Sequence, residues 1–330
     1  MPDIQTTLAK DIDIENLTIR YDRSVKCVLA NIPVLAPIAK YTVKELENCS
    51  IPMIEKCIDA ESIQISEVFV EPGLSNVNTK ILNNDLEDKV PGEGRILYDI
   101  RFTITLPDGN RSKIIINIEA QQKSNPGYSI LNRGIFYAAR LISAQLSVEF
   151  TNDGSDSAQY DNIKKVYSIW ICMDCPANKK DSIINYSLEP HIIYQGNDKL
   201  KPYKNCDLIN IIFIHLNGQP DSSQHQLISL LDTLLSRMDA ETKKKKLQEE
   251  HQLPMTIKLE KEMSDMCNLS SGIREDGFKD GLIKGERKGT LRTNINNIRN
   301  LMHTQNWSAE KAMSALGFDT SEYQKYLALL

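Results

Sequence analysis

The sequence predicts an α/β protein in which a mixed central β-sheet is flanked by helices and followed by a helical C-terminal extension. Residues 97–106 and 113–121 alternate apolar and polar side chains around a turn, as two half-buried strands do. Residues 164–173 and 208–216 are almost continuously apolar, which is typical of strands buried on both faces. Residues 128–149 carry apolar side chains at helical spacing. Together these patterns favour a layered α/β architecture.

Composition places the chain among ordinary globular proteins. Of its 330 residues, 41% are hydrophobic and 25% are charged, with a net charge of −5. This charge argues against a protein that coats nucleic acid over its whole surface, although it allows a locally basic groove. The sequence contains no long apolar run and no secretory signal, and its seven scattered cysteines favour free thiols. We therefore expect a cytoplasmic protein without a membrane span.

The N-terminal quarter precedes the hairpin. Residues 1–24 are polar, and we expect a loosely attached arm. Residues 25–39 are apolar but are interrupted by two prolines, and residues 43–58 have the pattern of short helices. Residues 62–71 alternate in polarity and predict a strand.

The hairpin aligns two carboxylates. Its apolar side chains all sit at even positions, so paired residue numbers must have an even sum if these side chains share a face. A three-residue loop at 108–110 sets that sum at 218 and places Asp99 opposite Glu119, with Cβ atoms roughly 4.5–5.5 Å apart. Such carboxylates repel each other unless a cation lies between them, and Mg²⁺ is the natural occupant. The alternative is an Asp and a Glu on a solvated face without function.

The helix predicted over residues 128–149 has two faces. The side expected to pack on the sheet carries Leu131, Ile135, Ala138, Ile142 and Leu146. The opposite side, expected to face outward, carries Arg133, Tyr137 and Arg140. Guanidinium and aromatic groups can hold phosphates or stack on bases. The alternative is a pair of solvated arginines, or arginines paired with an acidic patch elsewhere.

Further strands follow this helix. Residues 164–173 and 208–216 are predicted in the middle of the sheet, and residues 182–186 and 190–194 are additional strand candidates. The Cys-x-x-Cys at 172–175 has no second pair at a metal-binding spacing, and no two histidines share one. We therefore expect ordinary core and loop thiols there.

The C-terminal part is predicted to be helical. A lysine-rich helix begins near residue 241, and glycines recur every four or five residues over 272–289. Each glycine inside a helix costs about 0.8–1.0 kcal/mol relative to alanine, so this stretch is a marginal helix, a flexible linker, or a helix whose glycine face meets another backbone. The last forty residues predict short helices, for which an oligomerisation role is favoured over a DNA-reading helix-turn-helix.

Four blocks carry a family resemblance: YDIRF at 98–102, NIEAQ at 117–121, PGYSILNRGIFYAARLISAQ at 126–145 and VYSIWIC at 166–172. In this order they resemble the PD-(D/E)XK nuclease superfamily, and within it the bacterial recombination-promoting nuclease, or transposase, family. The resemblance implies a restriction-endonuclease-like fold. It divides the chain into an arm at 1–24, a nuclease-like domain at 25–240 and a helical extension at 241–330.

The resemblance also implies metal-dependent cleavage of DNA phosphodiesters, associated with recombination or transposition. Asp99 and Glu119 would hold Mg²⁺, with Mn²⁺ as a substitute, together with the carbonyl of Ala120. Gln121 stands where the superfamily more often has lysine. Its amide can orient a water by hydrogen bonds but cannot supply positive charge to the transition state.

A third acidic residue is expected shortly before the first strand of the hairpin. Glu87 is the best match in this sequence, as a metal ligand or a water-positioning group, and Glu93 is a weaker one. A solvated acidic loop is the alternative for both.

Two other classes of function stay open. One is a degenerate nuclease fold that binds DNA or a protein without cutting. The other is a structural protein in which the carboxylates are incidental. The partners that we expect are DNA, no membrane, and a second copy of the chain through the C-terminal helices.

Overall fold

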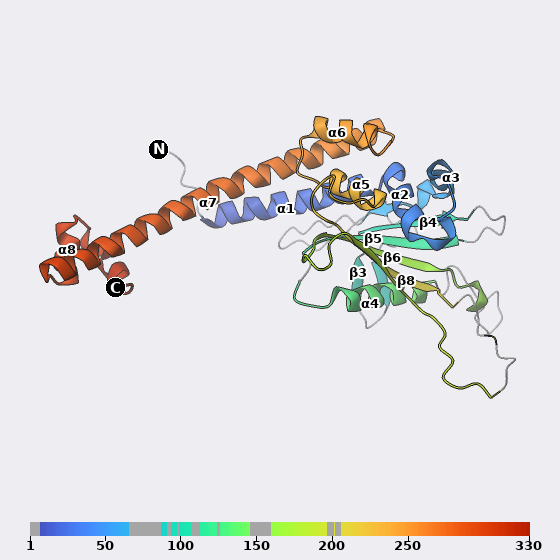
Figure 1. Ribbon diagram of the computed structural model, residues 1–330, viewed down its shortest axis with the longest axis horizontal. Helices are drawn as coiled ribbons and strands as arrows, with labels where there is room; N and C mark the ends of the chain where they lie inside the picture. The colour runs from blue at the N-terminus through green and yellow to red at the C-terminus, as the bar shows by residue number, and fades with distance from the viewer. Residues whose placement is uncertain are drawn as a thin grey trace. The chain divides into compact units, whose positions relative to one another are not determined.

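The computed structural model in Figure 1 describes residues 7–65, 87–90, 94–97, 99–106, 113–123, 126–145, 160–196, 201 and 206–330. For residues 87–90 and 94–97 it describes the backbone alone. The chain divides into two compact units. One consists of Thr18–Leu269, and the other combines Met1–Leu17 with Ser270–Leu330.

A six-stranded mixed sheet forms the centre of the larger unit, as the sequence predicts. Its strand order is β1-β4-β5-β6-β8-β7. Neighbours β5, β6 and β8 are parallel, and the remaining pairs are antiparallel. The bounds are β1 Gln64–Ile65, β4 Ile100–Thr105, β5 Lys113–Lys123, β6 Val166–Asp174, β7 Ser182–Ser187 and β8 Ile209–His215. A separate two-stranded sheet pairs β2 (Glu87–Val90) with β3 (Gly94–Leu97).

The two apolar strands lie where their patterns place them. β6 runs between β5 and β8, and its first seven residues are buried. β8 is likewise buried from its second residue onward. The prediction of a strand at 190–194 is wrong, because these residues form no strand in the structure. Ile193 and Tyr194 are 99% and 84% exposed and pack on no sheet. Of the strand predicted at 62–71, the structure describes β1, and residues 66–71 lie outside the described residues.

Helices cover both faces of this sheet (Figure 1). One face packs against helices α1, α2, α3 and α5 around the even-numbered isoleucines of β4 and β5. Leu247, Leu259 and Met263 extend this core into helix α6 and the start of helix α7. The bounds are α1 Thr7–Leu29, α2 Ile32–Thr42, α3 Ile51–Cys57, α5 Gln226–Leu234, α6 Ala240–Glu249 and α7 Ile257–Gln305. The polar arm predicted at 1–24 therefore overlaps a helix.

Helix α4 (Ile130–Ser143) covers the opposite face, but it is rotated relative to the prediction. The side chains of Tyr137 and Arg140 are buried against the sheet, whereas Ile135 is 49% exposed. The expectation that Arg133, Tyr137 and Arg140 face outward is therefore wrong. Gly134 explains the rotation, because a Cβ there would lie 2.8 Å from the Ile211 Cγ2 atom. The helix approaches the sheet closely at this glycine, which has no side chain to hold the two apart.

The smaller unit contains the end of α7 with helices α8 (Ala309–Ala315) and α9 (Tyr323–Leu327). Their core includes Ile298, Met313 and Tyr326. The glycine-spaced stretch 272–289 is helical throughout, and nothing lies within 4 Å of a Cβ built at Gly285 or Gly289. The alternative of a glycine face meeting another backbone is therefore not met at these two positions. Within the described residues, no helix combines the length and the apolar character needed to span a bilayer.

Candidate active site

The hairpin register brings the two predicted carboxylates together. β4 and β5 pair antiparallel with Ile100 opposite Ile118, which is the predicted sum of 218. The predicted loop at 108–110 lies outside the described residues. One residue before β4 begins, the backbone N–H of Asp99 donates a hydrogen bond to the Glu119 Oε1 atom over 3.2 Å. The side chain of Glu119 therefore lies directly against Asp99.

Both carboxylates are held by groups of the hairpin itself. Glu119 is 2% exposed, and its Oε1 atom also accepts a hydrogen bond from the Asn117 Nδ2 atom at 3.2 Å. The Asp99 Oδ2 atom accepts one from the backbone N–H of Ala120 at 3.0 Å. Buried carboxylates require such donors because they have lost water. These bonds fix the orientation of both groups before any ligand arrives.

Two cationic side chains from different helices complete the site. Lys26 of α1 is 6% exposed, and its Nζ atom lies 2.8 Å from both Asp99 Oδ1 and Asp22 Oδ2. Arg133 of α4 approaches from the other side, with an NH2 atom 3.9 Å from Glu119 Oε2. Each carboxylate therefore faces one positive charge.

Aromatic rings fix the guanidinium of Arg133. Its central carbon lies 4.8 Å from the ring centre of Tyr137 and 5.3 Å from that of Trp170. Its nitrogens donate hydrogen bonds to the hydroxyls of Tyr137 at 2.8 Å and Tyr128 at 2.7 Å. Stacking of a cation on aromatic faces is attractive and orients the planar group.

Burial disfavours the charged form of both carboxylates. The pKa of Glu119 is raised well above its usual range, first by burial and then by the negative charge of Asp99. Burial also raises the pKa of Asp99, although Lys26 and the Ala120 N–H oppose this shift. A bound cation would favour the charged form of both carboxylates and would offset the repulsion by Asp99 that raises the pKa of Glu119.

The donor set at this site suits a hard divalent cation. Asp99 and Glu119 offer carboxylate oxygens, as Mg²⁺ prefers, and the carbonyl of Ala120 stays a predicted ligand. The Asn117 Oδ1 atom is also buried there, without a hydrogen-bond partner among the described residues. No group of three or more His, Cys, Asp or Glu side chains able to hold a metal occurs in the described part of the chain.

The other predicted site residues have separate outcomes. Gln121 lies on β5, two residues beyond Glu119, and pairs in register with Cys172 of β6. The backbone of Glu87 in β2 pairs with Leu97 of β3, but the side chain of Glu87 lies outside what the structure describes, as does all of Glu93. The third acidic ligand therefore stays a prediction. The 172–175 cysteines are buried free thiols, as expected.

Three site residues were not predicted from the sequence. Lys26 is the one charged residue in the apolar run 25–39, and Asn117 is a fully buried amide within a run of isoleucines. An isolated polar group in such a run was the available signal, because buried polar groups need partners. Trp170 is fully buried beneath Arg133, and no sequence pattern links these two residues.

Comparison with known proteins adds one finding. The family model described as a PD-(D/E)XK nuclease family transposase matches residues 69–275, which is more than half of the chain. No curated protein and no solved structure matches the chain. The matched segment includes Asp99, Glu119, Gln121 and Arg133, whereas Lys26 lies before it.

Proposed function

Because the chain belongs to the PD-(D/E)XK nuclease family of transposases, we propose that it is a metal-dependent endonuclease that cleaves DNA phosphodiester bonds during recombination or transposition. The observation that carries this proposal is the buried carboxylate pair, joined by the hydrogen bond from Asp99 N–H to Glu119 Oε1. In their charged forms Asp22, Asp99 and Glu119 carry three negative charges, against the two positive charges of Lys26 and Arg133. A cation bound by Asp99 and Glu119 would offset this excess of negative charge.

Asp99 and Glu119, with the carbonyl of Ala120, would hold Mg²⁺, and Mn²⁺ would substitute for it. When bound, the cation would polarise the scissile phosphate and lower the pKa of an attached water. Gln121 follows Glu119 by two residues, so its side chain leaves the same face of β5. There its amide would orient the attacking water by hydrogen bonds.

Positive charge reaches the site from outside the hairpin. The guanidinium of Arg133 is fixed by two rings and two hydroxyls, so it would bind a phosphate oxygen without first losing side-chain freedom. The ammonium of Lys26 would balance Asp99 and supply the charge that Gln121 lacks. Arg133, with Tyr137 beside it, is the part of the predicted DNA-binding set that lies at this site. Arg140 is buried further along α4.

A DNA-binding protein without nuclease activity is the second candidate function. It is favoured by the ion pair between Lys26 and Asp99, which already neutralises one metal ligand. In that case the buried charges would stabilise the fold and present Arg133 to DNA. The two candidates differ in whether phosphodiester bonds are cut.

A plasmid-nicking assay separates the two candidates. Supercoiled DNA is incubated with the full chain in Mg²⁺, in Mn²⁺ or in EDTA, using the wild type and the variants Asp99→Asn and Glu119→Gln. Glu189→Gln is the control, because Glu189 is an exposed carboxylate. We expect nicking with either metal by the wild type and the control, and a loss of at least 100-fold in both site variants.

Absence of cleavage by the wild type with either metal would contradict the proposal. A gel-shift titration in increasing salt then tests for DNA binding alone. Binding through phosphate contacts weakens steeply with salt because counterions are released.

A further inference from the structure

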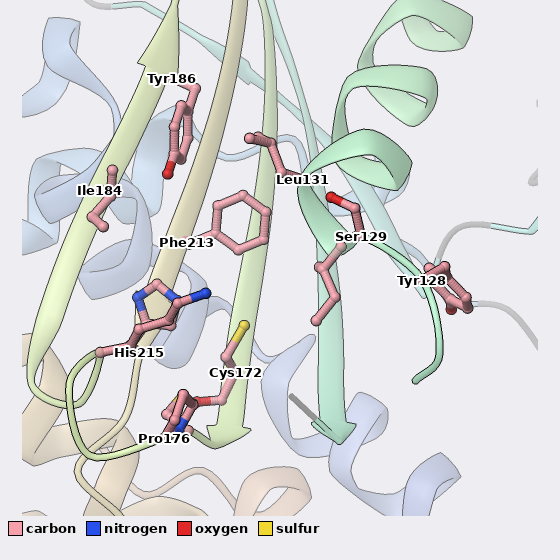
Figure 2. A pocket seen from close by; sticks show the side chains of 12 residues that line it. Tyr128, Ser129, Leu131, Cys172, Pro176, Ile184, Tyr186, Phe213 and His215 are labelled. Carbon is pink, nitrogen blue, oxygen red and sulfur yellow. The ribbon is translucent and has the colours of Figure 1, made fainter. Parts of the chain in front are cut away.

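A cavity lies on the α4 side of the sheet (Figure 2). It has a volume of about 550 Å³, which falls in the range of roughly 300–1,000 Å³ of small-molecule pockets. Strands β6, β7 and β8 supply one wall, and the start of α4 supplies the other. Figure 2 shows Phe213 at its centre, with Tyr186 and Ile184 on one side and Leu131 and Ser129 on the other.

The sheet register places this cavity beside the carboxylates. Glu119 pairs with Trp170, Trp170 with Phe213, and Phe213 with Ile184, so the four residues form one row across the sheet. The next row of the same face joins Gln121 to Cys172 and His215. Side chains of one row share a face of the sheet. Glu119 on β5 and the cavity lining that begins on β6 therefore lie on neighbouring strands of one face of the sheet.

Tyr128 connects the two sites directly. It lines the cavity, and its hydroxyl accepts the 2.7 Å hydrogen bond from Arg133. The same guanidinium lies 3.9 Å from Glu119. A DNA strand whose phosphate met Arg133 would therefore also lie beside Tyr128 of the cavity lining.

The lining of the cavity suits a flat aromatic ring. Phe213 stacks on Trp170 with ring centres 6.1 Å apart, and Tyr186 meets Phe213 edge-on at 5.9 Å. The side chains of Tyr186 and Ile184 are 41% and 38% exposed, so they retain surface for a ligand. Phe213 is only 5% exposed, so the exposed rings of Tyr186 and Tyr128 are the ones that would stack on a nucleobase.

Groups that can carry a positive charge are few in the lining of the cavity. Lys179 and His215 line it, and the His215 Nδ1 atom lies 3.1 Å from the Ser182 hydroxyl. An apolar pocket with a few convergent polar groups is typical of a site for a small planar ligand. Lys179 adds a positive charge suited to the phosphate attached to such a ligand.

We propose that this cavity receives one nucleobase that has left the DNA stack beside the cleaved phosphodiester. The proposal rests on the proposed function and specifies its substrate class: DNA with an unpaired nucleotide, such as a bulge, a mismatch or a strand end. An unpaired base enters the cavity most readily because no base pair has to be broken first.

Binding measured in EDTA tests the cavity separately from cleavage. The full chain is titrated into a labelled duplex with one bulged nucleotide and into the fully paired duplex at one salt concentration, followed by fluorescence anisotropy. Tyr186→Ala removes one wall, and Ile184→Trp fills the space. Both positions are exposed enough to spare the fold, which circular dichroism checks. Ile193→Trp is the control, because Ile193 is 99% exposed and lies outside the cavity.

We expect the wild type and the control to bind the bulged duplex about ten-fold tighter than the paired one, in line with the strength of base–aromatic stacking. Both cavity variants should reduce this ratio to near one while keeping the affinity for paired DNA. Loss of the ratio in these variants supports the cavity assignment even if no metal supports cleavage. Equal affinity of the wild type for both duplexes, or a ratio that both variants keep, overturns it even if the nuclease is active.

Discussion

Replacing Lys26 by methionine tests the charge balance of the site. The side chains of Lys26 and Asp99 are 8% and 17% exposed, and their charged atoms lie 2.8 Å apart. Removal of one partner from a buried ion pair costs about 3–5 kcal/mol, because the other charge is left uncompensated. Asp99 is partly solvated and its raised pKa allows it to take up a proton, so we expect the lower end, about 3 kcal/mol of unfolding free energy.

Urea denaturation in EDTA measures this loss. The chain has two tryptophans, Trp170 in the sheet and Trp307 in the smaller unit. A Trp307→Phe background therefore makes fluorescence report on Trp170 alone. Arg20→Met is the control, because Arg20 is exposed on the same helix, and it should change the free energy by less than about 0.5 kcal/mol.

A double variant shows whether the cost arises from Asp99. If Lys26→Met is harmful because it strands this carboxylate, then adding Asp99→Asn should recover about 2 kcal/mol, since contacting residues couple by about 0.5–3 kcal/mol. Strict additivity of the two changes would refute the reasoning. So would a loss in Lys26→Met no larger than that of the Arg20 control.

Three further predictions concern the same site. Gly134→Ala should lower the unfolding free energy by about 1–3 kcal/mol in urea denaturation, because its Cβ would lie 2.8 Å from Ile211; unchanged stability would contradict the close approach of α4. Glu119→Gln should increase the unfolding free energy in EDTA by about 1 kcal/mol, which a higher melting temperature would show. In the wild type the pKa of Glu119 is raised, so above about pH 4 the native state holds more protons than the unfolded state. The stability of the metal-free protein should therefore fall as the pH rises, and it should fall less in this variant. Equal pH slopes of the two proteins would contradict this prediction. Arg133→Lys should reduce kcat/KM for DNA cleavage about 10–100-fold with an unchanged circular dichroism spectrum, because lysine lacks the planar group that lies over Tyr137 and Trp170. Full activity would exclude a role for the guanidinium.

The hairpin was predictable because its constraints are local. Two rows of apolar side chains fix which face each strand buries, and a one-residue slip would expose the isoleucines of β5. These rows require an even sum of paired residue numbers, and a three-residue loop at 108–110 then places Asp99 opposite Glu119. The buried strands β6 and β8 were equally accessible, since a continuous apolar run needs cover on both faces.

The rotation of α4 was not predictable from its apolar stripe. That argument assumed that apolar side chains are buried and arginines exposed. In the structure Ile135 is half exposed, while Arg133 reaches Glu119 and Arg140 is buried. A polar site beneath the helix reverses the usual preference at Arg133, because the buried carboxylate of Glu119 attracts its guanidinium. Gly134 carried the signal for a close approach.

Lys26 could not be predicted as a site residue, for a different reason. It meets Asp99 across 73 positions of sequence, and only the packing of α1 beside the sheet brings them together. Local patterns contain no information on such pairs.

Calorimetric titration of Mn²⁺ into the metal-free full chain tests the shared cation most directly. The account predicts saturable binding to the wild type that is weakened at least ten-fold in both Asp99→Asn and Glu119→Gln, and that is unchanged in the exposed control Glu189→Gln. Binding that survives both substitutions, or no binding to the wild type, would contradict it.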